Sequence, residues 1–149
     1  QPDGSVAIAA TDLELPNGMV LVDGGRTLIV AETRAIPPRI TSFAVAADGT
    51  LSDRRVLIEL ENEMPDGLTV DTDDNIWFAS PFTGELIQVS RPGQILQRVA
   101  SPRPPYACVL GGADGRTMFV CVADDWNPEV CRAERSGAIL SFPVAVGGR

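Results

Sequence analysis

The sequence predicts an all-β fold, a β-propeller of four-stranded blades, within a single domain or half-propeller spanning residues 1–149. Three observations support this prediction: many short apolar runs bounded by turn residues, a motif that recurs along the chain, and strands that are apolar on both faces. The 149 residues include 14 Gly and 12 Pro, which suits short strands better than long helices. No stretch has a convincing helical period.

A short motif marks the start of each repeat. Pro16-Asn17-Gly18 recurs as Pro65-Asp66-Gly67 and, weakly, as Pro105-Tyr106-Ala107, at spacings of 49 and 40 residues. After each start, a second apolar run follows beyond a few turn residues, so each pair of runs predicts a β-hairpin. These second runs are residues 27–31, 75–79 and 117–121.

Further strands complete each repeat. They are expected at residues 40–46 and 56–60, at 85–89 and 95–100, and at 138–146. Ser5–Ala10 is interpreted as the last strand of a preceding repeat, which gives about twelve strands and about three blades. Runs such as 19–22 and 28–31 are apolar on both faces, as expected for a sheet packed between two others. A β-sandwich of about twelve strands is the alternative.

The composition excludes several classes of function. Without His, the chain has no Ser–His–Asp triad and no His-ligated metal, so a metal would be held by oxygen or sulfur. The net charge of −8 argues against nucleic acid and anionic lipid as partners. No apolar run reaches the roughly 18 residues of a membrane span. Three cysteines without a C-x-x-C motif favour a reducing compartment, and we expect a cytoplasmic protein.

Asn17 and Asp66 hold the same position in two successive repeats. Equivalent positions of propeller blades face one another across the central channel, so these side chains are expected to converge at one mouth. Their amide and carboxylate oxygens suit a hard divalent cation. Gly18 and Gly67 would allow close backbone approach and unusual φ and ψ angles. A plain turn is the alternative, and Tyr106 takes this position in the third repeat.

Six motifs in one order resemble the SMP-30/gluconolactonase family, which includes regucalcin and bacterial lactonases. They are Asn17-Gly18-Met19, residues 25–31, residues 52–55, residues 65–71, residues 75–79 and residues 111–117. The resemblance extends from about Ala10 to about Phe142. It implies a six-bladed propeller that hydrolyses sugar lactones with one bound divalent cation. Ca²⁺ is the cation expected first, and Zn²⁺, Mn²⁺ and Mg²⁺ are the alternatives.

The resemblance also implies roles for two residues. The family's metal-binding Asn and Asp fall on Asn17 and Asp66, and the Asp is the family's general base. With no His, Asp66 is also the best available base in this chain: a cation would activate water and polarise the lactone carbonyl, and a carboxylate would take the proton. A non-catalytic binding module, or an inactive fragment lacking the family's N-terminal ligands, is the alternative.

The family's third ligand, a Glu, and a substrate-binding Asn and Arg belong to an N-terminal half that this sequence does not contain. The chain is therefore interpreted as a fragment or half-protein that needs this half. The alternative is self-association, in which two copies close the ring and each lends Ser5–Ala10 to the third blade of the other.

Weaker candidates each have a structural alternative. Residues 71–75 begin like an EF-hand loop but lack its Gly and Glu, so a hairpin turn is expected. Residues 124–128 are expected to form a solvated loop in which Trp126 is packed. The alternative is that this loop borders the substrate-binding mouth of the channel. Arg54 and Arg55 are expected to pair with carboxylates, and a position of Glu32 near the channel is the less favoured interpretation.

Cys108 and Cys121 lie on the two strands of the third hairpin. If Leu110 pairs with Phe119, the two cysteines face each other. Two small buried side chains are then the expected outcome, and a cross-strand disulfide is the strained alternative.

Overall fold

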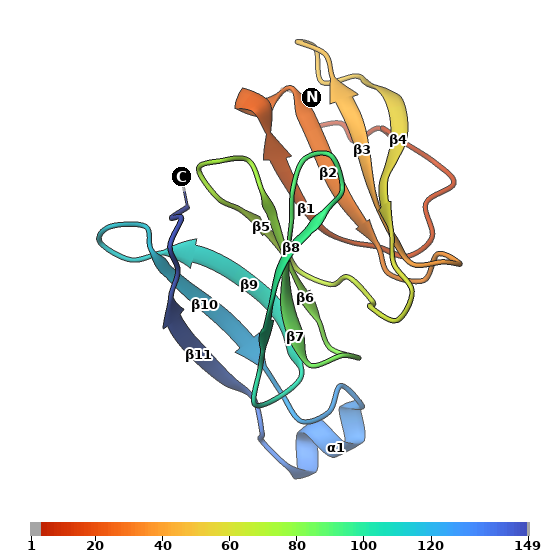
Figure 1. Cartoon of the computed structure of the whole chain (residues 1–149). Helices are drawn as coiled ribbons and strands as arrows, with labels where there is room; N and C mark the ends of the chain where they lie inside the picture. The colour runs from red at the N-terminus through yellow and green to blue at the C-terminus, as the bar shows by residue number, and fades with distance from the viewer. Residues whose placement is uncertain (1–3, 149) are drawn as a thin grey trace.

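The computed structural model of the chain describes residues 4–148, and these are nearly all β. Eleven strands form three antiparallel sheets, each running in sequence order (Figure 1). The first sheet contains β1 (Pro16–Val22), β2 (Thr27–Glu32), β3 (Arg39–Val45) and β4 (Leu51–Glu59). The second contains β5 (Leu68–Val70), β6 (Ile76–Ser80), β7 (Glu85–Val89) and β8 (Ile95–Ala100). The third contains β9 (Pro105–Gly111), β10 (Thr117–Val122) and β11 (Ala138–Pro143).

The first strands of the three sheets meet at the centre, where β5 contacts both β1 and β9. The second sheet is packed between the other two, and its strand β6 is buried along its whole length. Ile76 and Phe78 belong to the core shared with the first sheet. Trp77 and Ala79 belong to the core shared with the third sheet. This alternation explains why β6 is apolar on both faces: each face is covered by a different neighbour.

The outward faces of the first and third sheets are exposed in part: on the first sheet, Val30, Thr41 and Phe43 are buried on this face, whereas β1 is not. In β10, Met118 and Val120 are buried against the second sheet, whereas Phe119 is exposed. In β1, Met19 and Leu21 are exposed in the same alternating way. Burial on both faces therefore holds for residues 29–31 and for β6, and it fails for residues 19–22, where Met19 and Leu21 are exposed.

One expectation about the elements is wrong. Residues 5–10 form no strand: Val6 and Ile8 are almost fully exposed, and the segment belongs to none of the three sheets. The chain also contains short helical segments, a 3₁₀ turn, η1 (Asp23–Gly25), and α1 (Pro128–Ala133). A helix of six residues shows no amphipathic period, and local signals start it instead: Asn127 caps its first turn and Pro128 follows.

No helix within residues 4–148 has the length and apolar character needed to cross a membrane.

The β9–β10 register also differs from the expectation. Leu110 pairs with Met118, and Cys108 with Val120, one residue away from the expected pairing. This register turns Met118 and Val120 into the core, and a slip by one residue would turn them out to solvent. Cys108 is therefore buried while Cys121 is exposed, and both thiols are free.

Candidate functional site

Backbone hydrogen bonds join the equivalent positions of the three repeats. The amide of Gly18 donates to the carbonyl oxygen of Asp66 at 3.1 Å, and the amide of Gly67 donates to that of Tyr106 at 2.9 Å. A Cβ on Gly18 would lie 2.4 Å from the Asp66 oxygen, and one on Gly67 would lie 2.7 Å from the Cα of Ala107. Neither glycine has a positive φ. Close approach of the strands therefore explains both glycines, and the expected unusual backbone angles are not the reason.

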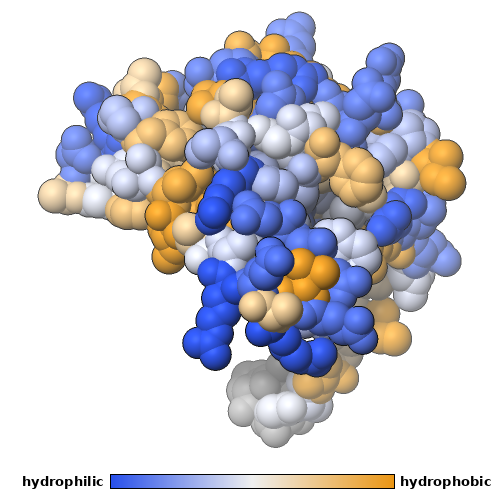
Figure 2. Space-filling model, turned by 90° about the horizontal axis from the view of Figure 1, so that it is seen from below, coloured by the Kyte–Doolittle hydropathy of each residue, from blue (hydrophilic) through white to orange (hydrophobic). Residues whose placement is uncertain are grey.

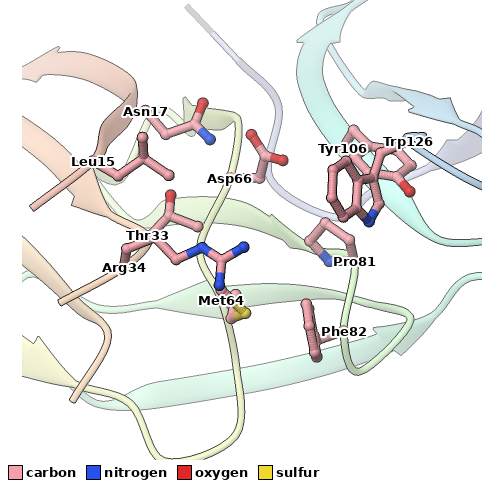
Figure 3. Close-up of a pocket in the computed structure, with 10 residues that line it drawn as sticks. All are labelled: Leu15, Asn17, Thr33, Arg34, Met64, Asp66, Pro81, Phe82, Tyr106 and Trp126. Atoms are coloured by element: carbon pink, nitrogen blue, oxygen red, sulfur yellow. The ribbon is translucent and has the colours of Figure 1, made fainter. Parts of the chain in front are cut away.

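Asn17 and Asp66 meet at one cavity of about 320 Å³ at the end of the molecule that carries α1 (Figures 1 and 3). Its lining residues are Leu15, Asn17, Thr33, Arg34, Met64, Asp66, Pro81, Phe82, Tyr106 and Trp126. In Figure 3, the Asn17 amide points toward the Asp66 carboxylate, and the aromatic rings lie on the far side of Asp66. Seen from this end, the surface is a mosaic of apolar and hydrophilic side chains (Figure 2).

The Asp66 carboxylate is half-buried and has unusual electrostatics for a surface acid. Burial raises its pKa, and a hydrogen bond from the Asn17 side chain opposes the increase. No Arg within residues 4–148 forms an ion pair with it. A carboxylate that is partly desolvated and unmatched by a cationic side chain is suited to accept a proton or to bind a cation.

The donors fit a hard divalent cation in kind but not in number. Asn17 and Asp66 offer an amide oxygen and a carboxylate, and Ca²⁺ takes about six to eight oxygen ligands. Among the described residues, no group of three or more His, Cys, Asp or Glu side chains converges as a metal site would require. These two residues could thus supply part of a coordination shell.

Glu32 lies outside this cavity, in an ion-pair cluster within the first sheet. It has no exposed surface, and its carboxylate meets Arg39 at 2.9 Å and Arg54 at 3.1 Å. Burial alone would raise its pKa, but hydrogen bonds from Arg39, Thr41, the Glu14 amide and Arg54 lower it to about 2. The expected pairing of Arg54 with a carboxylate is confirmed, and the placement of Glu32 near the channel is wrong.

The loops at residues 71–75 and 124–128 were the weaker candidates for a functional role, and the structure shows the conformation of both. The predicted hairpin turn at residues 71–75 is confirmed: Asp71 Oδ1 accepts hydrogen bonds at 2.9 Å from the amides of Asp73 and Asn75. In the loop at residues 124–128, Trp126 is 72% exposed and lines the cavity. The expectation of a packed Trp is therefore wrong, and the alternative at the cavity mouth describes its position.

Most residues that line the cavity were not predicted from the sequence, although their positions in the repeats indicate that they lie together. Leu15 and Met64 both stand directly before the Pro that opens a repeat. Arg34, Phe82 and Trp126 all follow the second strand of their sheet. Positions that are equivalent in the repeats therefore come together at one end, as Asn17 and Asp66 do.

Comparison with known proteins adds independent information. Residues 1–124 match the family model described as "SMP-30/Gluconolactonase/LRE-like region". A pentonolactonase, XacC, from Haloferax volcanii is 29% identical over 99% of this chain and 53% of its own length. A regucalcin from Oryctolagus cuniculus is 34% identical over 63% of this chain and 33% of its own length.

Solved structures share the fold. A luciferin-regenerating enzyme superposes with a TM-score of 0.85 over 100% of this chain and 52% of its own, at 20% identity. A regucalcin from Agrobacterium tumefaciens, described as a calcium-binding protein, gives a TM-score of 0.79 over 98% and 51%, at 19% identity. Such low identities establish a fold of the propeller type and no more. The chain spans about half or less of the length of these relatives.

Proposed function

Because the chain belongs to the SMP-30/gluconolactonase/LRE-like family, we propose that it carries part of the active site of a lactonase that uses one divalent cation. The observation that carries the proposal is the convergence of Asn17 with the half-buried carboxylate of Asp66 on one cavity. The pentonolactonase among its relatives supports lactones as the substrate class, and sugar lactones are the first to test.

Asn17 and Asp66 have separate roles in this proposal. A divalent cation bound by both would polarise the lactone carbonyl and lower the pKa of the attacking water. Asp66 would take the proton as that water adds to the carbonyl carbon, and would return it to the ring oxygen as the acyl C–O bond breaks, a contribution of about 10²–10⁴ in rate. Burial raises the pKa of Asp66 in the chain without a cation, and a bound cation would lower it. Asn17 is the neutral ligand and holds the Asp66 carboxylate in place through its amide.

Ca²⁺ is the cation that we propose first, because both donors are hard oxygens and one structural relative is described as calcium-binding. Zn²⁺, Mn²⁺ and Mg²⁺ remain alternatives for the same donors. The remaining ligands would come from outside this chain. We propose that its three sheets form half of a six-bladed ring, which accords with relatives of about twice its length.

The test is Asp66→Asn in the whole protein, with acid release from a panel of lactones followed by a pH indicator. We expect kcat to fall at least about 100-fold, together with weaker Ca²⁺ binding in a titration. Asp73→Asn is the matched control, since Asp73 is exposed and lies outside the cavity. Turnover that survives in Asp66→Asn would contradict the assignment.

A binding module without catalysis is the second candidate. It is favoured by the two donors that the described residues supply, fewer than a complete metal site needs. If the wild-type protein binds the cation but releases no acid from any lactone, this second function replaces the first.

A further inference from the structure

Two exposed aromatic side chains line the cavity beside Asp66. Phe82, in the β6–β7 turn, and Trp126, between β10 and β11, are both 72% exposed. Among the large hydrophobic side chains exposed within residues 4–148, the only other aromatic one is Phe119. Aromatic surface left in water is unfavourable unless it binds something. Two different sheets thus contribute such a surface to the same cavity (Figure 3).

The chain around Trp126 is built to hold it in place. Asp125 Oδ1 accepts hydrogen bonds from the amides of Trp126 at 2.7 Å and Asn127 at 2.8 Å. The side chain of Asn127 in turn caps α1 by accepting from the amide of Glu129 at 2.9 Å. Trp126 therefore sits on a turn that is fixed on its C-terminal side by a helix.

The base of this segment is also tied down. Arg103 forms an ion pair with Asp124 at 3.2 Å and donates to the carbonyl oxygen of Ser136 at 2.6 Å. The amide of Asp124 donates to the Ser136 hydroxyl at 3.1 Å. The two ends of the segment are joined on either side of Trp126, so its exposed indole is presented at a defined position.

The rest of the wall is poor in groups that could bind hydroxyls. Leu15, Met64 and Pro81 are apolar. The Thr33 hydroxyl already donates to the carbonyl oxygen of Pro65 at 2.7 Å. Apart from Asn17 and Asp66, which the proposed chemistry uses, the polar groups left on this wall are the Arg34 guanidinium and the Tyr106 hydroxyl. A substrate with a hydroxyl on each carbon would replace only some of its hydrogen bonds to water on this wall.

We propose that Phe82 and Trp126 bind a hydrocarbon substituent of the substrate, so that the preferred lactone carries an alkyl or aryl group in place of several hydroxyls. This inference rests on the proposed lactone hydrolysis, which it makes specific. Each methylene buried against these rings should strengthen binding by roughly fourfold, since burial of a CH₂ group contributes about 0.8 kcal/mol.

Binding is tested separately from chemistry. The protein used is the Asp66→Asn variant, in which hydrolysis should be at least about 100-fold slower. It is titrated with δ-lactones that carry alkyl chains of increasing length and with D-glucono-1,5-lactone, and binding is followed by tryptophan fluorescence. We expect affinity to rise with chain length, with D-glucono-1,5-lactone weakest. Adding Trp126→Phe should remove the fluorescence response, because the remaining Trp77 is buried. Adding Phe82→Ala should flatten the dependence on chain length, and adding Phe119→Ala, outside the cavity, should leave it unchanged.

Hydrolysis is measured in parallel on the otherwise wild-type protein. Trp126→Ala and Phe82→Ala should raise KM for the long-chain lactones with little change in kcat. Affinity that does not depend on chain length, or D-glucono-1,5-lactone bound most tightly, would overturn this inference even if hydrolysis occurs. Chain-length-dependent binding without acid release would uphold it while removing the proposed hydrolysis.

Discussion

Glu32 is a fully buried carboxylate whose charge is matched by two arginines. We expect Glu32→Gln to lower the free energy of unfolding by about 3 kcal/mol at pH 7, because Arg54 loses its ion-pair partner and Arg39 keeps only the longer contact with Glu14, at 3.7 Å. Glu61 is exposed and forms no ion pair within residues 4–148, so Glu61→Gln should change the free energy of unfolding by less than about 0.5 kcal/mol. Urea unfolding monitored by circular dichroism measures both values.

The same residue predicts an acid dependence of stability. The pKa of Glu32 is about 2 in the folded chain against an ordinary 4.5. Its contribution is therefore complete above pH 4.5 and is lost as the pH falls toward 2. The wild-type protein should lose about 3 kcal/mol more than Glu32→Gln over this interval. If the free energies of unfolding of the two proteins fall by the same amount between pH 4.5 and pH 2, Glu32 is not the group responsible for the acid dependence.

Single residues also mark where sequence reasoning succeeded and where it stopped. The shared position of Asn17 and Asp66 was sufficient to predict that they converge, because repetition fixes placement around an axis. For Trp126 the repeat indicates only the end of the molecule, because Trp126 follows the second strand of its sheet; its exposed position could not be predicted, since it lies in a long segment specific to the third repeat. The hydrogen bonds of Asp125 and Asn127 that turn it toward the cavity become visible only in three dimensions.

At the level of the elements, the central strands β1, β5 and β9 pack backbone against backbone at Gly18 and Gly67. Gly67→Ala would place a Cβ 2.7 Å from the Cα of Ala107, and backbone cannot rotate away as a side chain can. We expect this substitution to destabilise the fold by about 1–3 kcal/mol as β5 and β9 move apart. Thermal unfolding reports the change.

Gly137→Ala is the matched control for this prediction. No atom lies within 4 Å of the added Cβ, and Gly137 has no positive φ. This substitution should be neutral or slightly stabilising, since alanine restricts the unfolded chain. Equal melting temperatures for the two alanine variants would mean that the strands at the centre tolerate more separation than the structure indicates.

Strands were easier to predict than their registers. The apolar runs located all eleven strands of the described residues, since each run is bounded by turn residues. The β9–β10 pairing was wrong by one residue because the turn, with positive φ at Gly112 and Gly115, sets the register. Residues 5–10 have strand-like composition but belong to none of the three sheets, and a strand forms only where a neighbouring edge accepts its hydrogen bonds.

At the scale of the whole molecule, the three sheets form a stack whose two ends are covered only in part. The third sheet exposes Val109, Phe119 and Ile139 on its outward face, and the first exposes Met19 and Leu21. The second sheet, covered on both sides, indicates what these outer faces lack: another sheet. Relatives of about twice the length could cover both ends within one chain.

We therefore expect the 149-residue chain on its own to self-associate through these outward faces. Light scattering after size exclusion, over a range of concentrations, should give a mass that rises above 15.8 kDa. Phe119→Ser with Ile139→Ser removes apolar area from the third sheet and should shift the mass toward the monomer. Ile36→Ser serves as the control, because Ile36 is 92% exposed in the β2–β3 loop, away from either face. A monomer at every concentration would mean that the outward faces are stable in water. If Ile36→Ser weakens the association as much as the double variant does, the association comes from general surface hydrophobicity and not from the outward faces of the sheets.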